Sequence, residues 1–313
     1  MKRFGVGLSF FTGYAALSYA LFVLLAGPLI GSRDAGVATI VLSFCVGLGF
    51  AAQLGFDWSF QRPVKAVLKT SYIATALFCV LLVVIEFETW VCVAMMLPVL
   101  AITLPLGIWL LRWLMSLAIA PPQFAVGLLA LPLVLNLSGI LPPTRVTDYA
   151  VQTTVIVDAP AHALRRQVQN VAPITEAEQI WTCTHSVLRA PRPVRAETKQ
   201  GIRYAQWTQG VHFEEHLTTR DDPLRLDWEF HFPDLAAMQA LDLRVSPVGP
   251  DVIMQGGGYS LRPLSDHHTE VTLTTYYQLN TPINGYLSLW GEAFLQDMHR
   301  AVLHVVKSRA EAA

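Results

Sequence analysis

Charged side chains are scarce in this sequence, and cysteine is nearly absent. Only 14% of its 313 residues are Asp, Glu, Lys or Arg, against about 25% in a typical soluble protein. Of the four cysteines, Cys183 is the only one in the second half of the chain, so no disulfide framework can hold that half together. The net charge is −1. No cluster of positive charge suggests a nucleic-acid partner, and we predict none.

The few charged residues are distributed unevenly. Residues 4–141 hold nine of them, whereas residues 142–313 hold thirty-four, together with all nine histidines. Such a division is typical of a membrane half followed by a soluble half. We therefore predict two domains, a transmembrane helical domain over residues 1–144 and a soluble domain over residues 145–313.

Uncharged runs in the first half predict an all-α bundle of about five transmembrane helices. They cover residues 4–32, 35–56, 70–85, 90–111 and, after Pro121-Pro122, 124–141. The first run is too long for the apolar region of a signal peptide. Four spans with a re-entrant or interfacial last piece are the alternative. Asp57 and Arg112 fall at span ends, so nothing indicates an ion path.

The positions of Lys and Arg in the short loops predict the orientation. With the N-terminus in the cytoplasm, cytoplasmic segments would hold Lys2, Arg3, Arg62, Lys65, Lys69 and Arg112, and opposite segments Arg33 and Arg145. The chain is therefore predicted to be an integral membrane protein with its N-terminus in the cytoplasm and the lipid bilayer as a partner. Five spans would place the soluble domain outside the cytoplasm.

The second half alternates between helix and strand patterns. A strand is predicted over residues 151–157, a helix from Asp158 to residue 171, a shorter helix over 174–184 and an irregular Pro- and Arg-rich stretch over 191–195. Strands follow over 201–209, 211–219, 226–232, 252–263 and 269–279, with a lid or short helix over 232–242. Gly256-Gly257-Gly258 lacks the residues of a phosphate loop and predicts a bulge or kink.

The last predicted element is a long amphipathic helix over residues 284–309. Its large apolar residues recur at spacings of three and four: Leu287, Trp290, Phe294, Met298, Ala301 and Val305. Such a stripe must be covered by a sheet. We therefore predict an α+β helix-grip domain, in which a curved antiparallel sheet wraps around the long C-terminal helix.

Two stretches resemble the START-like superfamily, also called SRPBCC or polyketide cyclase/dehydrase-like. Residues 210–223 (GVHFEEHLTTRDDP) with Leu226 are similar to its F-x-E-x-I, D/E-P-P and R-L pattern. The tail, residues 275–307, resembles bacterial membrane-attached members, although Tyr276 and Leu287 replace tryptophans of that pattern. The resemblance covers about residues 150–309, and its bacterial members imply that the membrane is a bacterial inner membrane. It implies a helix-grip fold with a cavity between sheet and helix for an apolar ligand, and it implies no particular activity.

Glu215 is the most informative polar residue, because its strand position places it between Phe213 and Leu217 on an apolar face. A carboxylate there is costly unless it is paired. It is either an acid or ligand anchor in the cavity, or a structural partner of Arg203, Tyr204 or Tyr277. Aromatic residues complete the predicted ligand cavity, which comprises Glu215, Phe213, Trp207, Trp228, Tyr277, Tyr286, Trp290 and Phe294.

Three functions remain open. The first is a membrane-tethered domain that binds an apolar or lipid-like small molecule in the cavity. The second is an enzyme of the cyclase/dehydrase or hydrolytic kind, with Glu215 and a tyrosine as acid/base pair. The third is a structural or partner-binding module. We predict no cofactor and no metal site, since His212, Glu214 and His216 lack the further ligands of a zinc centre.

Overall fold

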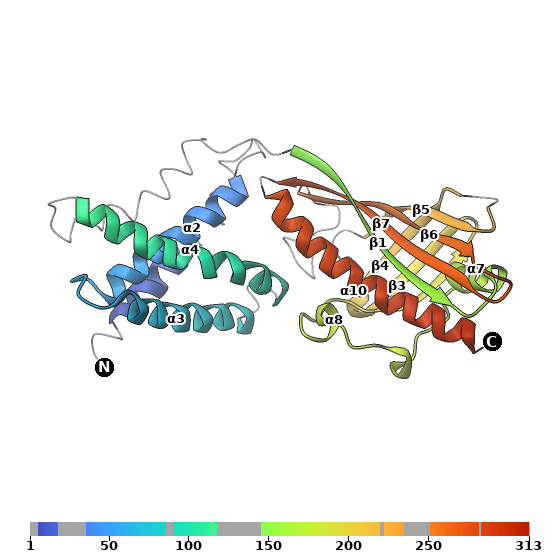
Figure 1. Cartoon of the computed structure of the whole chain (residues 1–313), viewed down its shortest axis with the longest axis horizontal. Helices are drawn as coiled ribbons and strands as arrows, with labels where there is room; N and C mark the ends of the chain where they lie inside the picture. Colours follow the sequence, from blue (N-terminus) through green and yellow to red (C-terminus); the bar gives the residue numbers. More distant parts are fainter. Residues whose placement is uncertain are drawn as a thin grey trace. The chain divides into compact units, whose positions relative to one another are not determined.

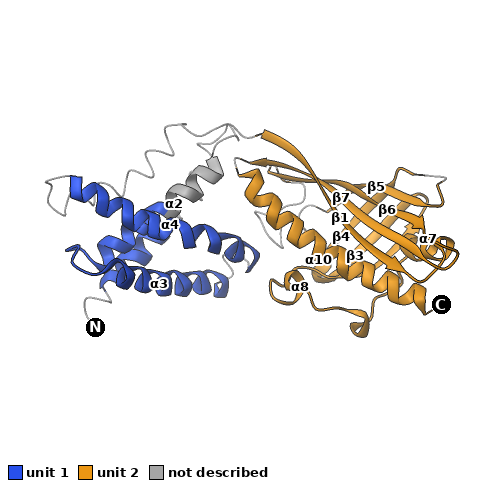
Figure 2. Cartoon of the chain, viewed as in Figure 1, with its two compact units in different colours: residues 1–144 blue, residues 145–313 orange. Residues whose placement is uncertain are grey.

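The computed structural model describes residues 6–17, 36–85, 90–117, 145–219, 222–234, 249, 251–281 and 283–312, with side chains in α2 described from residue 46. The chain forms two compact units, residues 1–144 and residues 145–313 (Figures 1 and 2). Each unit is described by itself below.

The described part of the first unit is helical. It holds a short apolar helix, Val6–Leu17, followed by α2 (Gly36–Phe56), α3 (Val64–Val84) and α4 (Trp90–Leu117). Among the described residues, two helices are long and apolar enough to cross a membrane, α3 and α4. The prediction of about five such helices is therefore not borne out. The predicted span over residues 124–141 lies outside the described residues, as does most of 4–32.

Glycines let the helices of the first unit approach closely. A Cβ on Gly49 of α2 would lie 2.7 Å from the Cα of Gly107 in α4, and one on Gly107 would lie 2.5 Å from the Val46 carbonyl oxygen. Gly7 and Gly55 make a similar contact between the first helix and α2. Small residues at helix crossings are typical of membrane proteins, where backbone packing replaces the hydrophobic effect.

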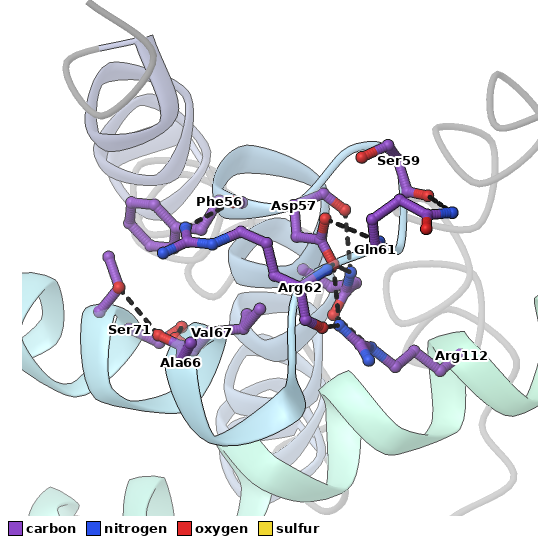
Figure 3. Close-up of polar contacts among 11 residues, drawn as sticks. Phe56, Asp57, Ser59, Gln61, Arg62, Ala66, Val67, Ser71 and Arg112 are labelled. Carbon is purple, nitrogen blue, oxygen red and sulfur yellow. Dashed lines mark hydrogen bonds and ion pairs between the residues drawn. The ribbon is translucent and has the colours of Figure 1, made fainter. Parts of the chain in front are cut away.

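A buried polar network joins the end of α2 to α4 (Figure 3). Arg112 Nη2 donates to Asp57 Oδ2 at 2.9 Å, and Arg112 Nε donates to Gln53 Oε1 at 2.8 Å. The Asp57 carboxylate also accepts the backbone N–H groups of Gln61 and Arg62. Arg112 lies inside α4, which continues to Leu117, so the helix does not end at Arg112 as predicted.

The second unit contains a seven-stranded antiparallel sheet in the order β1-β7-β6-β5-β4-β3-β2. The strands are β1 (Arg145–Val157), β2 (Pro193–Lys199), β3 (Ile202–Trp207), β4 (His212–Leu217), β5 (Arg225–His231), β6 (Val252–Pro263) and β7 (Thr269–Thr281). Between β1 and β2 lie α7 (Ala161–Gln169), a 3₁₀ turn (Glu176–Glu178) and the single turn α8 (Cys183–Ser186).

Several predicted boundaries in this unit need correction. The stretch predicted to be irregular, residues 191–195, runs into β2, because Pro193 lies on an edge strand where its missing N–H costs little. The helix predicted over 174–184 is reduced to a 3₁₀ turn and part of α8. The irregularity predicted at Gly256-Gly257-Gly258 lies just before them, since the β6–β7 register shifts between Met254 and Gly256 and is regular through the three glycines. Residues 232–234 are not helical, and 235–242 lie outside the described residues.

The final helix, α10 (Asn284–Glu311), runs along one face of the sheet beside β1 and β7 (Figure 1). Its C-terminal half packs into the main core through Leu303, Val306 and Ala310. Ala301 and Val305 of the predicted stripe are buried, whereas Leu287, Trp290, Phe294 and Met298 are only partly buried. The sheet and α10 fit a helix-grip fold, as predicted, with the helix covered more completely toward its C-terminus.

Candidate functional site

Aromatic rings line the face of the sheet that α10 packs against. The ring of Trp207 at the end of β3 lies 6.0 Å from that of Phe213 in β4, which lies 5.6 Å from Phe230 in β5. Phe230 in turn lies 6.3 Å from Trp228. Period-two alternation in each strand places these residues on one face. We call these four residues the sheet lining; it contains three of the predicted cavity residues, and the prediction omitted Phe230.

Glu215 lies within this face as half of an ion pair. It is directly opposite Arg203 in the β3–β4 register, and the Arg203 guanidinium donates to its carboxylate. Both residues are 4% exposed. The guanidinium also lies 5.8 Å from the centre of the Trp228 ring, within cation–π range. Of the partners predicted for Glu215, Arg203 is the one that the structure provides, while Tyr204 is exposed.

For each member of this pair, burial and the charge of the partner shift the pKa in opposite directions. Burial raises the pKa of Glu215, and the attraction of Arg203 opposes that shift. For Arg203, burial lowers the pKa, but Glu215 and Tyr259 outweigh it and raise the pKa above its usual value. Because a guanidinium does not lose its proton in proteins, a neutral Glu215 would leave a buried cation without a counter-charge. The pair is therefore ionised in the folded protein.

Tyr259 of β6 is the third polar member of this group. Its side chain is 2% exposed, and burial raises its pKa to about 12, although Arg203 opposes the shift. A phenol with such a pKa stays protonated at neutral pH. Tyr259 was missing from the predicted site, although its alternation with Leu261 in β6 places both on the inward face.

Two buried donors beside the sheet lining have no hydrogen-bond partner among the described residues. They are Arg203 Nε and Trp228 Nε1. Nε2 of His185, whose ring lies 6.4 Å from Trp207, is also buried without a partner there. Burial lowers the pKa of His185. Because unsatisfied buried polar groups are costly, these atoms mark places where a bound molecule or water would be stabilising.

The other predicted cavity residues form separate groups. Tyr286, Trp290 and Phe294 make a row on α10, with ring centres 6.5 and 5.5 Å apart. Tyr277 instead stacks on Tyr149 at 5.5 Å and belongs to a cluster with Leu287 and Leu295. Tyr277 is therefore a core residue, and the predicted cavity as a whole stays a prediction.

His212 and His216 of β4 are exposed. His216 Nε2 lies 2.7 Å from Glu214 Oε2, and His212 Nδ1 contacts the carbonyl of Gly210. His299 of α10 is instead buried, with Nδ1 3.1 Å from the Thr153 hydroxyl and Nε2 2.8 Å from the Thr275 hydroxyl. Burial lowers its pKa to about 4, so it is a neutral core residue at pH 7.

Of three comparisons with known proteins, the one with solved structures found similar proteins, and they match the second unit. No protein-family model matches the chain, and no curated protein does either. Among solved structures, Zhui aromatase/cyclase from Streptomyces sp. R1128 is 14% identical with a TM-score of 0.33, covering 53% of this chain and 94% of that one. A START superfamily protein from Mycobacterium smegmatis is 10% identical (TM-score 0.33, covering 52% and 97%).

A third similar structure is truncated norcoclaurine synthase from Thalictrum flavum, 8% identical with a TM-score of 0.32, covering 52% of this chain and 94% of that one. With TM-scores below 0.5, none of these likenesses supports a function for this chain. The fold assignment rests instead on the strand order and the position of α10.

Proposed function

We propose that this chain is a membrane-tethered domain that binds an apolar small molecule between its sheet and α10. The observation that carries the proposal is the sheet lining next to Arg203 Nε and Trp228 Nε1, two buried donors without a partner among the described residues. Aromatic walls with few polar groups are typical of small-molecule sites. An acceptor oxygen on an otherwise apolar ligand would satisfy one or both donors.

An acid/base enzyme is the weaker candidate. Glu215 is engaged by Arg203, and the raised pKa of about 12 keeps the nearby Tyr259 protonated. Neither group is poised to exchange a proton near neutral pH, as general catalysis requires. Both groups serve binding better than turnover.

The ligand is best tested on the full chain purified in detergent. Native mass spectrometry and solvent extraction should find a stoichiometric apolar molecule that carries an oxygen acceptor. Trp228→Phe, which removes Nε1 but keeps a ring, should retain less of it. Trp181→Phe is the matched control, because Trp181 is 72% exposed. Conversion of the molecule by the protein would favour the enzyme, and a wild-type protein without any ligand would favour a structural role.

The tethering part of the proposal rests on α3 and α4, which are long and apolar enough to span a bilayer. We propose a cytoplasmic N-terminus and an extracytoplasmic second unit, a topology that also requires the apolar residues 124–141 to cross the bilayer after α4. A reporter that works only outside the cytoplasm should then be active after Ala313 and inactive after Val64. The opposite pattern would reverse the orientation.

A further inference from the structure

A cavity of about 640 Å³ lies away from the sheet lining, between α7 and the adjacent ends of β3 and β4. None of the predicted cavity residues borders it. Its lining consists of Arg165, Gln169, Gln200, Gly201, Ile202, His216, Leu217 and Thr219. A volume of this size falls in the usual range of small-molecule pockets, roughly 300–1,000 Å³.

Arg165 supplies the positive charge of this pocket, and its guanidinium makes few contacts with other side chains. It is partly buried on α7, and its Nη1 donates to Gln169 Oε1 at 3.3 Å. Within the described ranges, no carboxylate lies within ion-pair distance of it. A guanidinium has five N–H donors, so most of its donors are left for other partners. Burial lowers the pKa of Arg165, and the more distant Asp222 opposes this.

The remaining lining divides into neutral polar groups and an apolar floor. Gln169, Gln200 and Thr219 supply amide and hydroxyl groups, and none of the described residues that line the cavity is a carboxylate. His216 is already hydrogen-bonded to Glu214. Ile202 and Leu217 are the apolar members, and Leu217 also packs against the main core, which gives the pocket a firm wall.

We infer that this pocket binds a small organic anion whose carboxylate or phosphate is held by Arg165. Gln169, Gln200 and Thr219 would hydrogen-bond the same ligand, and its apolar part would lie against Ile202 and Leu217. A guanidinium suits such anions because its planar N–H groups can donate to two oxygens at once. This site is separate from the apolar site proposed above and does not depend on it.

Calorimetric titration of the detergent-purified full chain tests the inference, with hexanoate, inorganic phosphate and hexylamine as probes. Hexanoate should bind saturably, and Arg165→Gln should weaken its binding at least tenfold while the thermal unfolding temperature changes little. Arg166→Gln is the matched control, since this neighbour on α7 is exposed; binding should not change. Tighter binding of hexanoate than of phosphate would assign an organic rather than an inorganic anion.

Three results would overturn the inference: no saturable binding of either anion, equal binding by Arg165→Gln and wild type, or hexylamine binding as tightly as hexanoate. Trp228→Phe separates the two sites. If it weakens hexanoate binding and Arg165→Gln does not, the anion occupies the sheet-lining site and the pocket beside α7 is not the binding site.

Discussion

Arg203 and Glu215 lie directly opposite each other on β3 and β4 and form an ion pair that is almost completely buried. Trp228 and Tyr259 flank the guanidinium. A pair in this position adds little net stability, because the free-energy cost of removing both charges from water offsets most of their attraction. Removing one partner, however, leaves the other charge without a counter-charge in an apolar environment.

Glu215→Gln should therefore be strongly destabilising, by about 3–5 kcal/mol, because it leaves Arg203 as an uncompensated buried cation. The double variant Arg203→Met/Glu215→Leu should recover most of that loss, since neither charge remains. Urea unfolding of the single and double variants measures both effects. Additive losses in the double variant would contradict the ion-pair interpretation.

The sequence predicts much of this pair and its surroundings, because alternation places Glu215 with Phe213 on the apolar face of one strand and Trp228 on the apolar face of the next. It leaves the partner of Glu215 open among Arg203, Tyr204 and Tyr277, since the choice depends on the β3–β4 register. That choice matters energetically: a tyrosine partner would tolerate Glu215→Gln, whereas an arginine does not. His185 could not be predicted, because no periodicity marks the single turn of α8.

His299 predicts a pH dependence of stability. Its pKa is about 4 in the folded protein, against an ordinary value of 6.5, so the unfolded chain takes up the proton first as the pH falls. Its contribution is complete above pH 6.5, is lost as the pH falls from 6.5 to 4, and amounts to ~3 kcal/mol at most. Urea unfolding of a fragment of residues 145–313 between pH 4 and 8 measures the slope.

His299→Gln should remove most of this slope, and the buried His185 contributes a remainder of the same sign, because its pKa is also lowered. His304→Gln is the control on the same helix, since His304 is exposed. An unchanged slope in His299→Gln would show that other groups cause the pH dependence. Aggregation of the fragment would show that the second unit does not fold by itself.

The close contact at Gly107 predicts that the packing of α2 against α4 does not tolerate a larger side chain at this position. A single Cβ there would lie 2.5 Å from the Val46 carbonyl oxygen and 2.9 Å from the Cα of Gly49, so Gly107→Ala should force α2 and α4 apart. Gly13→Ala is the control, because no atom of the described residues lies within 4 Å of its added Cβ. Thermal unfolding in detergent should occur at lower temperature for Gly107→Ala only. Equal unfolding temperatures would contradict this helix packing.

Uncharged runs predict α3 and α4 well but not the polar network between α2 and α4. Charged residues near the ends of apolar runs are typical interfacial anchors, which the sequence predicts for Asp57, whereas it predicts only a helix end for Arg112. The contact between them spans 55 positions, and no local pattern encodes that distance. The long β1 was partly missed for a related reason, since residues 145–150 are stabilised by pairing with β7 rather than by an apolar face.

Substitutions of Asp57 and of Arg112 should destabilise the protein to different extents. The side chain of Asp57 is 1% exposed and that of Arg112 is 22% exposed. Asp57 also accepts hydrogen bonds from the backbone of Gln61 and Arg62 in the α2–α3 connection. Asp57→Ala should therefore destabilise the detergent-solubilised protein by about 3–5 kcal/mol, because it leaves Arg112 without its counter-charge and two backbone N–H groups without an acceptor.

Arg112→Gln should cost less, because Asp57 keeps its two backbone donors and the Gln53 amide. Lys65→Gln, which removes an exposed cation nearby in α3, should leave the unfolding temperature unchanged. The order of thermal unfolding should thus be Asp57→Ala lowest, Arg112→Gln intermediate, and Lys65→Gln equal to wild type. If Arg112→Gln were the more harmful change, the ion pair rather than the backbone contacts of Asp57 would hold this end of the helices together.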